Sequence, residues 1–136
     1  MLAAMDVLPV IVGASLLVAA AFLLVIVWLL RRRRMLPVAL RAKFRREWER
    51  AAAQNDPVRR VVETEKLLAA LLGALGFRGT FAEKLRRAGP RLPACDDVWN
   101  AHRLRNRLAH EVGVTVSDRE AERAVRAFGR AVDALL

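Results

Sequence analysis

The stretch VLPVIVGASLLVAAAFLLVIVWLLRRRR, residues 7–34, decides the fold of this chain. Its first twenty-four residues, 7–30, contain no ionisable side chain. As a helix that rises about 1.5 Å per residue, they would span roughly 36 Å, more than a hydrocarbon core of about 30 Å. Trp28 stands near the end of this run, at the depth where an indole favours the membrane interface. The sequence therefore predicts a transmembrane anchor over residues 1–30.

The charges that flank the apolar run predict its orientation. Asp6 is the only charged side chain before it, whereas Arg31, Arg32, Arg33 and Arg34 follow it directly. Because positive charge is retained on the cytoplasmic side, we expect a single pass through the cell inner membrane, with the N-terminus outside. A cleaved signal peptide would instead carry basic residues before a shorter apolar stretch. A core helix is the other alternative, but a domain this small could not enclose so long an apolar run.

Residues 31–54 are predicted to form a basic stem next to the membrane. Residues 31–50 hold nine Lys or Arg and two Glu, a large share of the net charge of +10. We expect this charge, above all the run of arginines 31–34, to lie at anionic lipid headgroups, and an RNA-binding arm is the alternative. Pro37 predicts the start of a helix that runs to about Gln54. Its apolar stripe consists of Leu40, Phe44 and Trp48.

Residues 55–136 are predicted to form a helical domain. Asp56 and Pro57 are typical of an N-cap and of the first residue of a helix, which we expect to run to about Leu75. Gly76 should end it, because glycine readily adopts the left-handed conformation that closes many helices. The chain has one cysteine, so an intramolecular disulfide is excluded.

Three further helices are expected in this domain. Thr80 to Glu83 and Ser117 to Glu120 are both typical of capping boxes, which open a short helix and the last helix. Asp96 or Asp97 is predicted to cap the helix between them, which should run to about Glu111. The predicted fold class is therefore all-α, with a transmembrane helix followed by a bundle of four to five helices. No Gly-rich phosphate loop, paired-cysteine zinc pattern or nucleophile elbow occurs in the sequence.

The densest polar segment is WNAHRLRNRLAHE, residues 99–111, which contains both histidines of the chain. His102, Asn106 and His110 recur every four residues, so on a helix they follow one stripe. Arg105 precedes His110 by five positions and would point about 140° away from it. Those two side chains would converge only at a helix end or across a dimer. Two histidines without further ligands nearby predict no metal site.

The segment Arg105-Asn106-x-x-x-His110 resembles the R-N-x-x-x-H signature of the HEPN superfamily. Members of that superfamily are small helical bundles, and many are metal-independent RNA endonucleases that act as dimers. The similarity covers residues 48–136. The whole chain resembles small bacterial proteins in which one membrane anchor precedes a HEPN-like domain. The positions that carry it are Trp48, residues 61–68, residues 76–80 and residues 99–111.

This resemblance implies a HEPN-like domain over residues 55–136, a homodimer, and RNA as a partner, with no metal or small-molecule cofactor. His110 would take or position the proton of an RNA 2′-hydroxyl, and Arg105 would bind the scissile phosphate. Asn106 would orient one of the two. Arg103 and Arg107, on the same helix, would bind RNA or phosphate.

A structural role for the same residues is the alternative. Asn106 and His110 would then close the helix end, and Arg105 would pair with an acid, for which Glu65 on a core-facing position is the candidate. His102 is predicted to be a packed histidine and not a ligand. Two functions thus remain open: a membrane-tethered module that recruits RNA or a protein, and a membrane-tethered ribonuclease.

Overall fold

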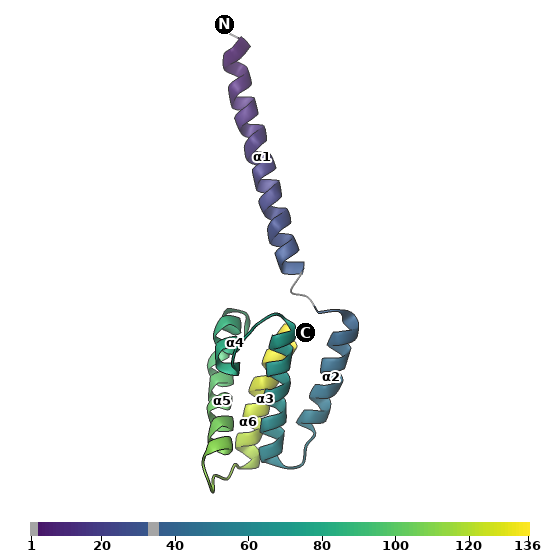
Figure 1. Ribbon diagram of the computed structural model, residues 1–136, viewed down its shortest axis with the longest axis vertical. Coiled ribbons are helices and arrows are strands. Elements are labelled where there is room, and N and C mark those ends of the chain that lie inside the picture. The colour runs from purple at the N-terminus through teal and green to yellow at the C-terminus, as the bar shows by residue number, and fades with distance from the viewer. Residues whose placement is uncertain (1–2, 33–35) are drawn as a thin grey trace. The chain divides into compact units, whose positions relative to one another are not determined.

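The computed structural model describes residues 3–32 and 36–136 and divides into two compact units, the second of which begins at Leu36. These described residues form six α-helices and one short 3₁₀ turn, and they contain no strand (Figure 1). The prediction of an all-α fold is confirmed.

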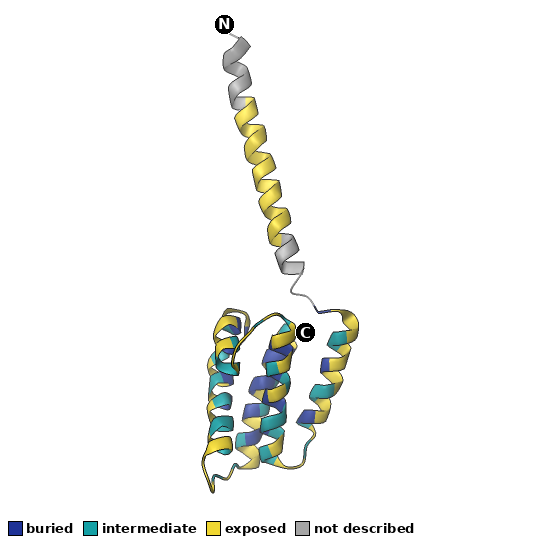
Figure 2. Cartoon of the chain, in the orientation of Figure 1, coloured by how far each residue is buried: buried dark blue, intermediate teal, exposed yellow. Residues whose placement is uncertain are grey.

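Helix α1, Ala3–Arg32, forms the first unit. The 18 residues from Val10 to Val27 are long and apolar enough to cross a membrane, and none of them is buried within the protein (Figure 2). Leaving that surface in water would cost about 25 cal/mol for each Å² of apolar area, so it favours an apolar environment. Arg31 and Arg32 continue the helix, whereas Arg33 and Arg34 lie outside the described residues.

Helix α2, Val38–Ala52, lies within the predicted stem, residues 31–54, but packs as part of the second unit. Phe44 of this helix is buried in the core, and Trp48 lies against Gly129, where an added Cβ would sit 3.0 Å from Cζ2 of the indole. Arg45 pairs with Asp133 at 3.7 Å. The sequence-based boundary at residue 55 therefore differs from the observed one at residue 36, because the apolar stripe of the stem is used to dock on the bundle.

Helix α3, Pro57–Ala74, begins and stops where local signals predict. The Asp56 carboxylate accepts hydrogen bonds from the backbone N–H groups of Val58 (3.4 Å) and Arg59 (3.0 Å). Gly76 adopts φ 91°, a left-handed conformation that is strained for other residues. The predicted cap and stop of this helix are confirmed.

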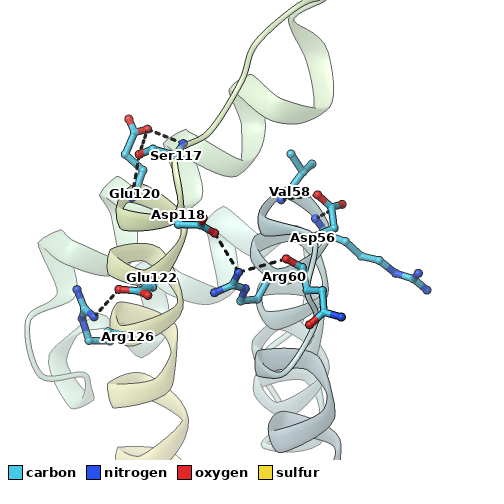
Figure 3. A network of polar contacts seen from close by, with 10 residues as sticks. Asp56, Val58, Arg60, Ser117, Asp118, Glu120, Glu122 and Arg126 are labelled. Atoms are coloured by element: carbon cyan, nitrogen blue, oxygen red, sulfur yellow. Dashed lines mark hydrogen bonds and ion pairs between the residues drawn. The ribbon is translucent and has the colours of Figure 1, made fainter.

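Helices α4, Phe81–Ala88, and α6, Asp118–Leu135, both open with the predicted capping boxes. At the start of α6, Ser117 Oγ accepts from the Glu120 N–H, and Glu120 Oε2 accepts from the Ser117 N–H at 3.0 Å. Figure 3 shows this cap beside the start of α3, where Arg60 Nη2 lies 3.4 Å from Asp118 Oδ1. That ion pair joins the starting ends of α3 and α6.

Helix α5, Cys95–His110, follows the short 3₁₀ turn Gly89–Arg91. The prediction that Asp96 or Asp97 caps it is wrong. The N-cap is Ala94, at φ 49° and without a side-chain hydrogen bond, because the chain leaves the preceding turn in a left-handed conformation and the helix starts earlier. Asp96 and Asp97 lie instead in the first turn, where negative charge favours the helix dipole.

The core of the second unit is carried largely by α3 and α6, whose inward faces are buried (Figure 2). Its largest fully buried side chains are Phe128, Leu68, Leu71, Leu72, Leu85, Val61, Val98, Val132 and Thr64. Among the described residues one charged side chain is buried with them, Glu65 of α3, which is 5% exposed. A buried carboxylate destabilises the fold unless it is paired, so Glu65 and its partners form the candidate functional site.

Candidate functional site

Glu65 meets two side chains of α5. Its Oε2 lies 2.9 Å from Nδ1 of His102, and its Oε1 lies 3.1 Å from Nε of Arg105. The contact with His102 is a hydrogen bond, whereas the contact with Arg105 is an ion pair held by charge and not by an aligned N–H. The alternative in which Arg105 pairs with Glu65 is thus confirmed.

Asn106 closes these contacts into a ring. Its Nδ2 lies 3.1 Å from Nε2 of His102, and Arg105 Nη1 donates to its Oδ1 at 3.4 Å. We call Glu65, His102, Arg105 and Asn106 the polar ring. Each member contacts the next, so three hydrogen bonds and one ion pair form a closed cycle across the α3–α5 interface.

The contacts of the polar ring assign the proton of His102. Because Oδ1 of Asn106 accepts from Arg105, the amide nitrogen of Asn106 faces His102 and donates to Nε2. Nε2 is then an acceptor, so the imidazole carries its proton on Nδ1 and donates it to Glu65. Each hydrogen bond of the ring thus has a donor that faces an acceptor.

Burial raises the pKa of Glu65 above its ordinary value. The hydrogen bond from His102 and the positive charge of Arg105 act in the opposite direction and lower that pKa. The buried carboxyl group therefore depends on its α5 partners for stabilisation. This dependence ties the R-N part of the motif to the stability of the domain.

His102 is packed between aromatic side chains. Its ring centroid lies 4.9 Å from that of Phe81 and 5.9 Å from that of Trp99. These contacts and its place in the polar ring agree with the prediction that His102 is a packed histidine.

His110 does not join the polar ring. It is the last residue of α5 and is exposed, and among the described residues no hydrogen bond or ion pair involves its imidazole. The structure thus brings Arg105 and Asn106 together with Glu65, not with His110. Asn106 also does not close the helix end, because its amide is engaged one turn earlier with His102.

Arg107 lines an open groove between α5 and α6 with a volume of about 530 Å³. Three more arginines of α6 line it, namely Arg123, Arg126 and Arg130. Arg103 is exposed on α5, and its guanidinium contacts the Asn100 side chain. Sequence reasoning named the two α5 arginines but missed the three on α6, although their spacing of three and four residues already placed them on one helix face.

Within residues 3–32 and 36–136, no three His, Cys, Asp or Glu side chains gather closely enough to hold a metal ion. The polar ring itself offers arginine, imidazole, amide and carboxylate groups. Compared with known proteins, the chain matches no family model, and neither a curated protein nor a solved structure is significantly similar to it.

Proposed function

We propose that this chain is a membrane-tethered helical binding module whose domain lies in the cytoplasm. In this proposal the R-N-x-x-x-H segment holds the fold and does not cleave RNA. The observation that carries it is the pairing of Arg105 with buried Glu65 inside the polar ring.

An arginine in this position is poorly suited to bind a scissile phosphate. Its charge is matched by Glu65, and two of its three nitrogens already face Glu65 and Asn106. A phosphate that approached the guanidinium would also approach the carboxylate, which repels it. His110 stands outside the ring, so the motif does not assemble a base and a phosphate ligand on one subunit.

Two features support a membrane-tethered binding module. Helix α1 is long and apolar enough to span the bilayer, and the arginines that follow it favour a cytoplasmic domain. The net charge of +10 and the arginine-lined groove favour an acidic partner. The HEPN resemblance further predicts a homodimer at the inner membrane, with anionic lipid at the stem.

The tether predicts a specific fractionation result. The full chain should sediment with membranes and stay there in alkaline carbonate, because the α1 surface is solvated by lipid. A fragment of residues 36–136, which has its own core, should stay in the aqueous fraction. In intact spheroplasts, protease added outside should leave the domain uncut and should digest it only after lysis. Release of the full chain by carbonate, or digestion before lysis, would contradict the tether or its orientation.

Ribonuclease activity is the second candidate, and one observation favours it. The Arg105 side chain keeps 32% of its surface exposed, and His110 is exposed on the same helix. In a dimer, the histidine of one subunit would take the 2′-hydroxyl proton while the arginine of the other held the phosphate. The 2′-oxygen would attack phosphorus, and the 5′-oxygen would leave as a hydroxyl that takes the proton back from the histidine, giving a 2′,3′-cyclic phosphate without a metal.

These two functions are separated by one assay on residues 36–136. We expect no cleavage of single-stranded RNA in EDTA by the unmodified domain. His110→Ala should melt at the same temperature as the unmodified domain, whereas Arg105→Ala should melt lower, because only Arg105 belongs to the polar ring. RNA cleavage that both substitutions abolish in folded protein would establish the enzyme instead.

A further inference from the structure

We propose that residues 76–94, which we call the α4 segment, bind anionic phospholipid headgroups of the membrane in which the chain is anchored. This inference rests on the proposed membrane tether and gives the chain a second lipid-binding site, separate from the arginines 31–34. The α4 segment comprises the turn after α3, helix α4, the 3₁₀ turn and the residues that lead to α5.

Positive charge is concentrated in the α4 segment. It holds five Lys or Arg and one Glu, a net charge of +4, whereas residues 51–75 and 95–136 together hold ten basic and ten acidic side chains. The opposite end of the second unit carries residues 53–56, with a net charge of −1, and residues 111–120, with a net charge of −2 (Figure 1). The domain therefore has a basic end and an acidic end, and a negatively charged surface would attract the basic one.

Three arginines of the α4 segment are available to an external anion. Arg78, Arg86 and Arg91 are exposed, and within the described part of the chain no hydrogen bond or ion pair involves their guanidinium groups. The other two basic side chains hold the local structure. Lys84 Nζ donates to a backbone oxygen of α3 at 3.0 Å, and Arg87 Nη1 donates to the backbone oxygen of Arg78 at 3.4 Å.

The one carboxylate of the α4 segment is engaged in the helix cap. Glu83 Oε2 accepts from the backbone N–H of Thr80 at 2.8 Å and from its hydroxyl at 3.1 Å. These hydrogen bonds lower the pKa of Glu83, and the positive charges of Arg87 and Arg86 lower it further. Glu83 is therefore ionised at neutral pH and already counted in the net charge of +4.

Three further acidic side chains near this end do not cancel the charge. Asp97 pairs with Arg130 at 2.7 Å, and Asp133 pairs with Arg45 at 3.7 Å. Each pair is neutral as a unit. Asp96, exposed in the first turn of α5, thus opposes a segment of net charge +4 with a single negative charge.

The α4 segment lies at the end of the second unit where the chain arrives from the anchor. Arg41, near the start of α2, donates from Nη1 to the backbone oxygen of Leu136 at 3.3 Å. Figure 1 shows the start of α2, the C-terminus and α4 at this same end of the second unit. Four peptide units connect Arg32 to Leu36 and reach at most about 14 Å. If α1 spans the bilayer, the start of α2 thus stays near the headgroups whatever the orientation of the domain.

The tether makes weak charge interactions sufficient. A site on a tethered domain meets its ligand at a high effective concentration, so its intrinsic affinity need not be high. Each basic residue close to an anionic leaflet strengthens binding about fivefold. Three exposed arginines at one end of the domain therefore favour an orientation with that end against the lipid.

RNA fits the α4 segment less well. Single strands are usually held by exposed aromatic side chains on which bases stack. Phe77 and Phe81, the aromatic residues of the α4 segment, pack against the core instead. A free RNA also lacks the effective concentration that the anchor gives to lipid.

The full chain in nanodiscs tests the proposal. One set of nanodiscs contains phosphatidylcholine alone, and the other contains equal parts of phosphatidylcholine and anionic phosphatidylglycerol. Amide hydrogen exchange is followed by mass spectrometry over residues 76–94 and, at the opposite end, over residues 111–117. In anionic nanodiscs we expect exchange in the α4 segment to be at least about threefold slower, and exchange over residues 111–117 to be unchanged. About 0.5 M NaCl should remove the difference, because it screens the charges.

Arg86→Gln with Arg91→Gln is the decisive variant and should remove most of the lipid-dependent slowing. The matched control is Arg59→Gln with Arg119→Gln, which removes the same charge at exposed positions in the first turns of α3 and α6. This control should behave like the unmodified chain. Arg86→Lys with Arg91→Lys keeps the charge and should keep the slowing. Circular dichroism melting establishes that all three variants are folded.

Binding to vesicles of the same two compositions measures the size of the effect. Residues 36–136 contain the whole hydrophobic core, so this part can be measured without the anchor once circular dichroism shows that it is folded. Arg86→Gln with Arg91→Gln should weaken binding to anionic vesicles about tenfold or more. We expect the control variant to bind within about threefold of the unmodified domain.

Three outcomes would overturn the lipid-binding proposal. The first is equal exchange of the α4 segment in neutral and anionic nanodiscs, and the second is equal loss in the α4 and control variants. The third is slowing by poly(U) RNA but not by phosphatidylglycerol, which would make the occupant a nucleic acid and leave the tether standing. A full chain that does not insert into nanodiscs would instead contradict the proposed tether, and this inference with it.

Discussion

Arg105→Ala is expected to lower the free energy of unfolding of residues 36–136 by about 2–3 kcal/mol at neutral pH. Removing one partner of a buried pair commonly costs about 3–5 kcal/mol, because the other charge is left without compensation. The cost is smaller here because Arg105 is partly exposed and His102 still donates to Glu65. Urea unfolding followed by circular dichroism measures it.

This loss should depend on pH. Burial raises the pKa of Glu65, and without Arg105 one of the interactions that lowers this pKa is gone. A carboxyl group whose pKa is higher in the folded state does not destabilise the fold below its unfolded pKa. The destabilisation grows as the pH rises from the unfolded pKa through the folded pKa. The difference between Arg105→Ala and the unmodified domain should therefore be larger at about pH 8 than at about pH 5.

Two variants test this explanation. Arg103→Ala removes an exposed arginine two positions earlier on α5 and should change the free energy of unfolding by less than about 0.5 kcal/mol. Glu65→Gln combined with Arg105→Ala removes the buried charge and should recover part of the loss. If Arg105→Ala is as stable as Arg103→Ala, the polar ring does not hold the fold and the arginine becomes available for another role.

Phe128→Ala is expected to have the largest effect of any single change discussed, a loss of about 3–5 kcal/mol. Phe128 is fully buried on α6, and its ring meets that of Phe81 edge to face at 6.4 Å. Truncation removes its contacts with the core and leaves a cavity that a bundle of packed helices can only partly close. Thermal unfolding of residues 36–136 should show a large decrease in Tm.

Two control substitutions are expected to lower Tm by smaller amounts. Phe128→Leu keeps most of the volume and should cost clearly less than alanine. Val112→Ala, at a fully exposed position between α5 and α6, should leave Tm nearly unchanged. Equal Tm values for Phe128→Ala and Val112→Ala would show that α6 is not packed as described.

The polar ring and the groove between α5 and α6 lie on different sides of α5. His102 and Asn106 face α3 through Glu65, whereas Leu104 and Arg107 face α6. The ring therefore fixes the rotation of α5 about its axis, and this rotation presents Arg107 to the groove. A variant that breaks the ring should disturb the groove as well.

The sequence by itself determined the features that depend on neighbours along the chain. An uninterrupted apolar run predicts a helix fit for a membrane, and the caps at Asp56, Thr80 and Ser117 form as their local hydrogen-bonding chemistry requires. Glu65 could also be identified, because a carboxylate on a core-facing position needs a counter-charge within reach.

Only the tertiary structure decided which side chains meet across helices. The stem helix docks on the bundle through Phe44 and Trp48, and α5 begins early because Ala94 turns the chain in a left-handed conformation. Packing also draws Arg105 toward Glu65, leaves His110 outside, and sets the arginines of α6 beside Arg107. Periodicity places residues on a face of one helix, but the neighbour of that face is chosen by how all the helices bury their apolar surfaces together.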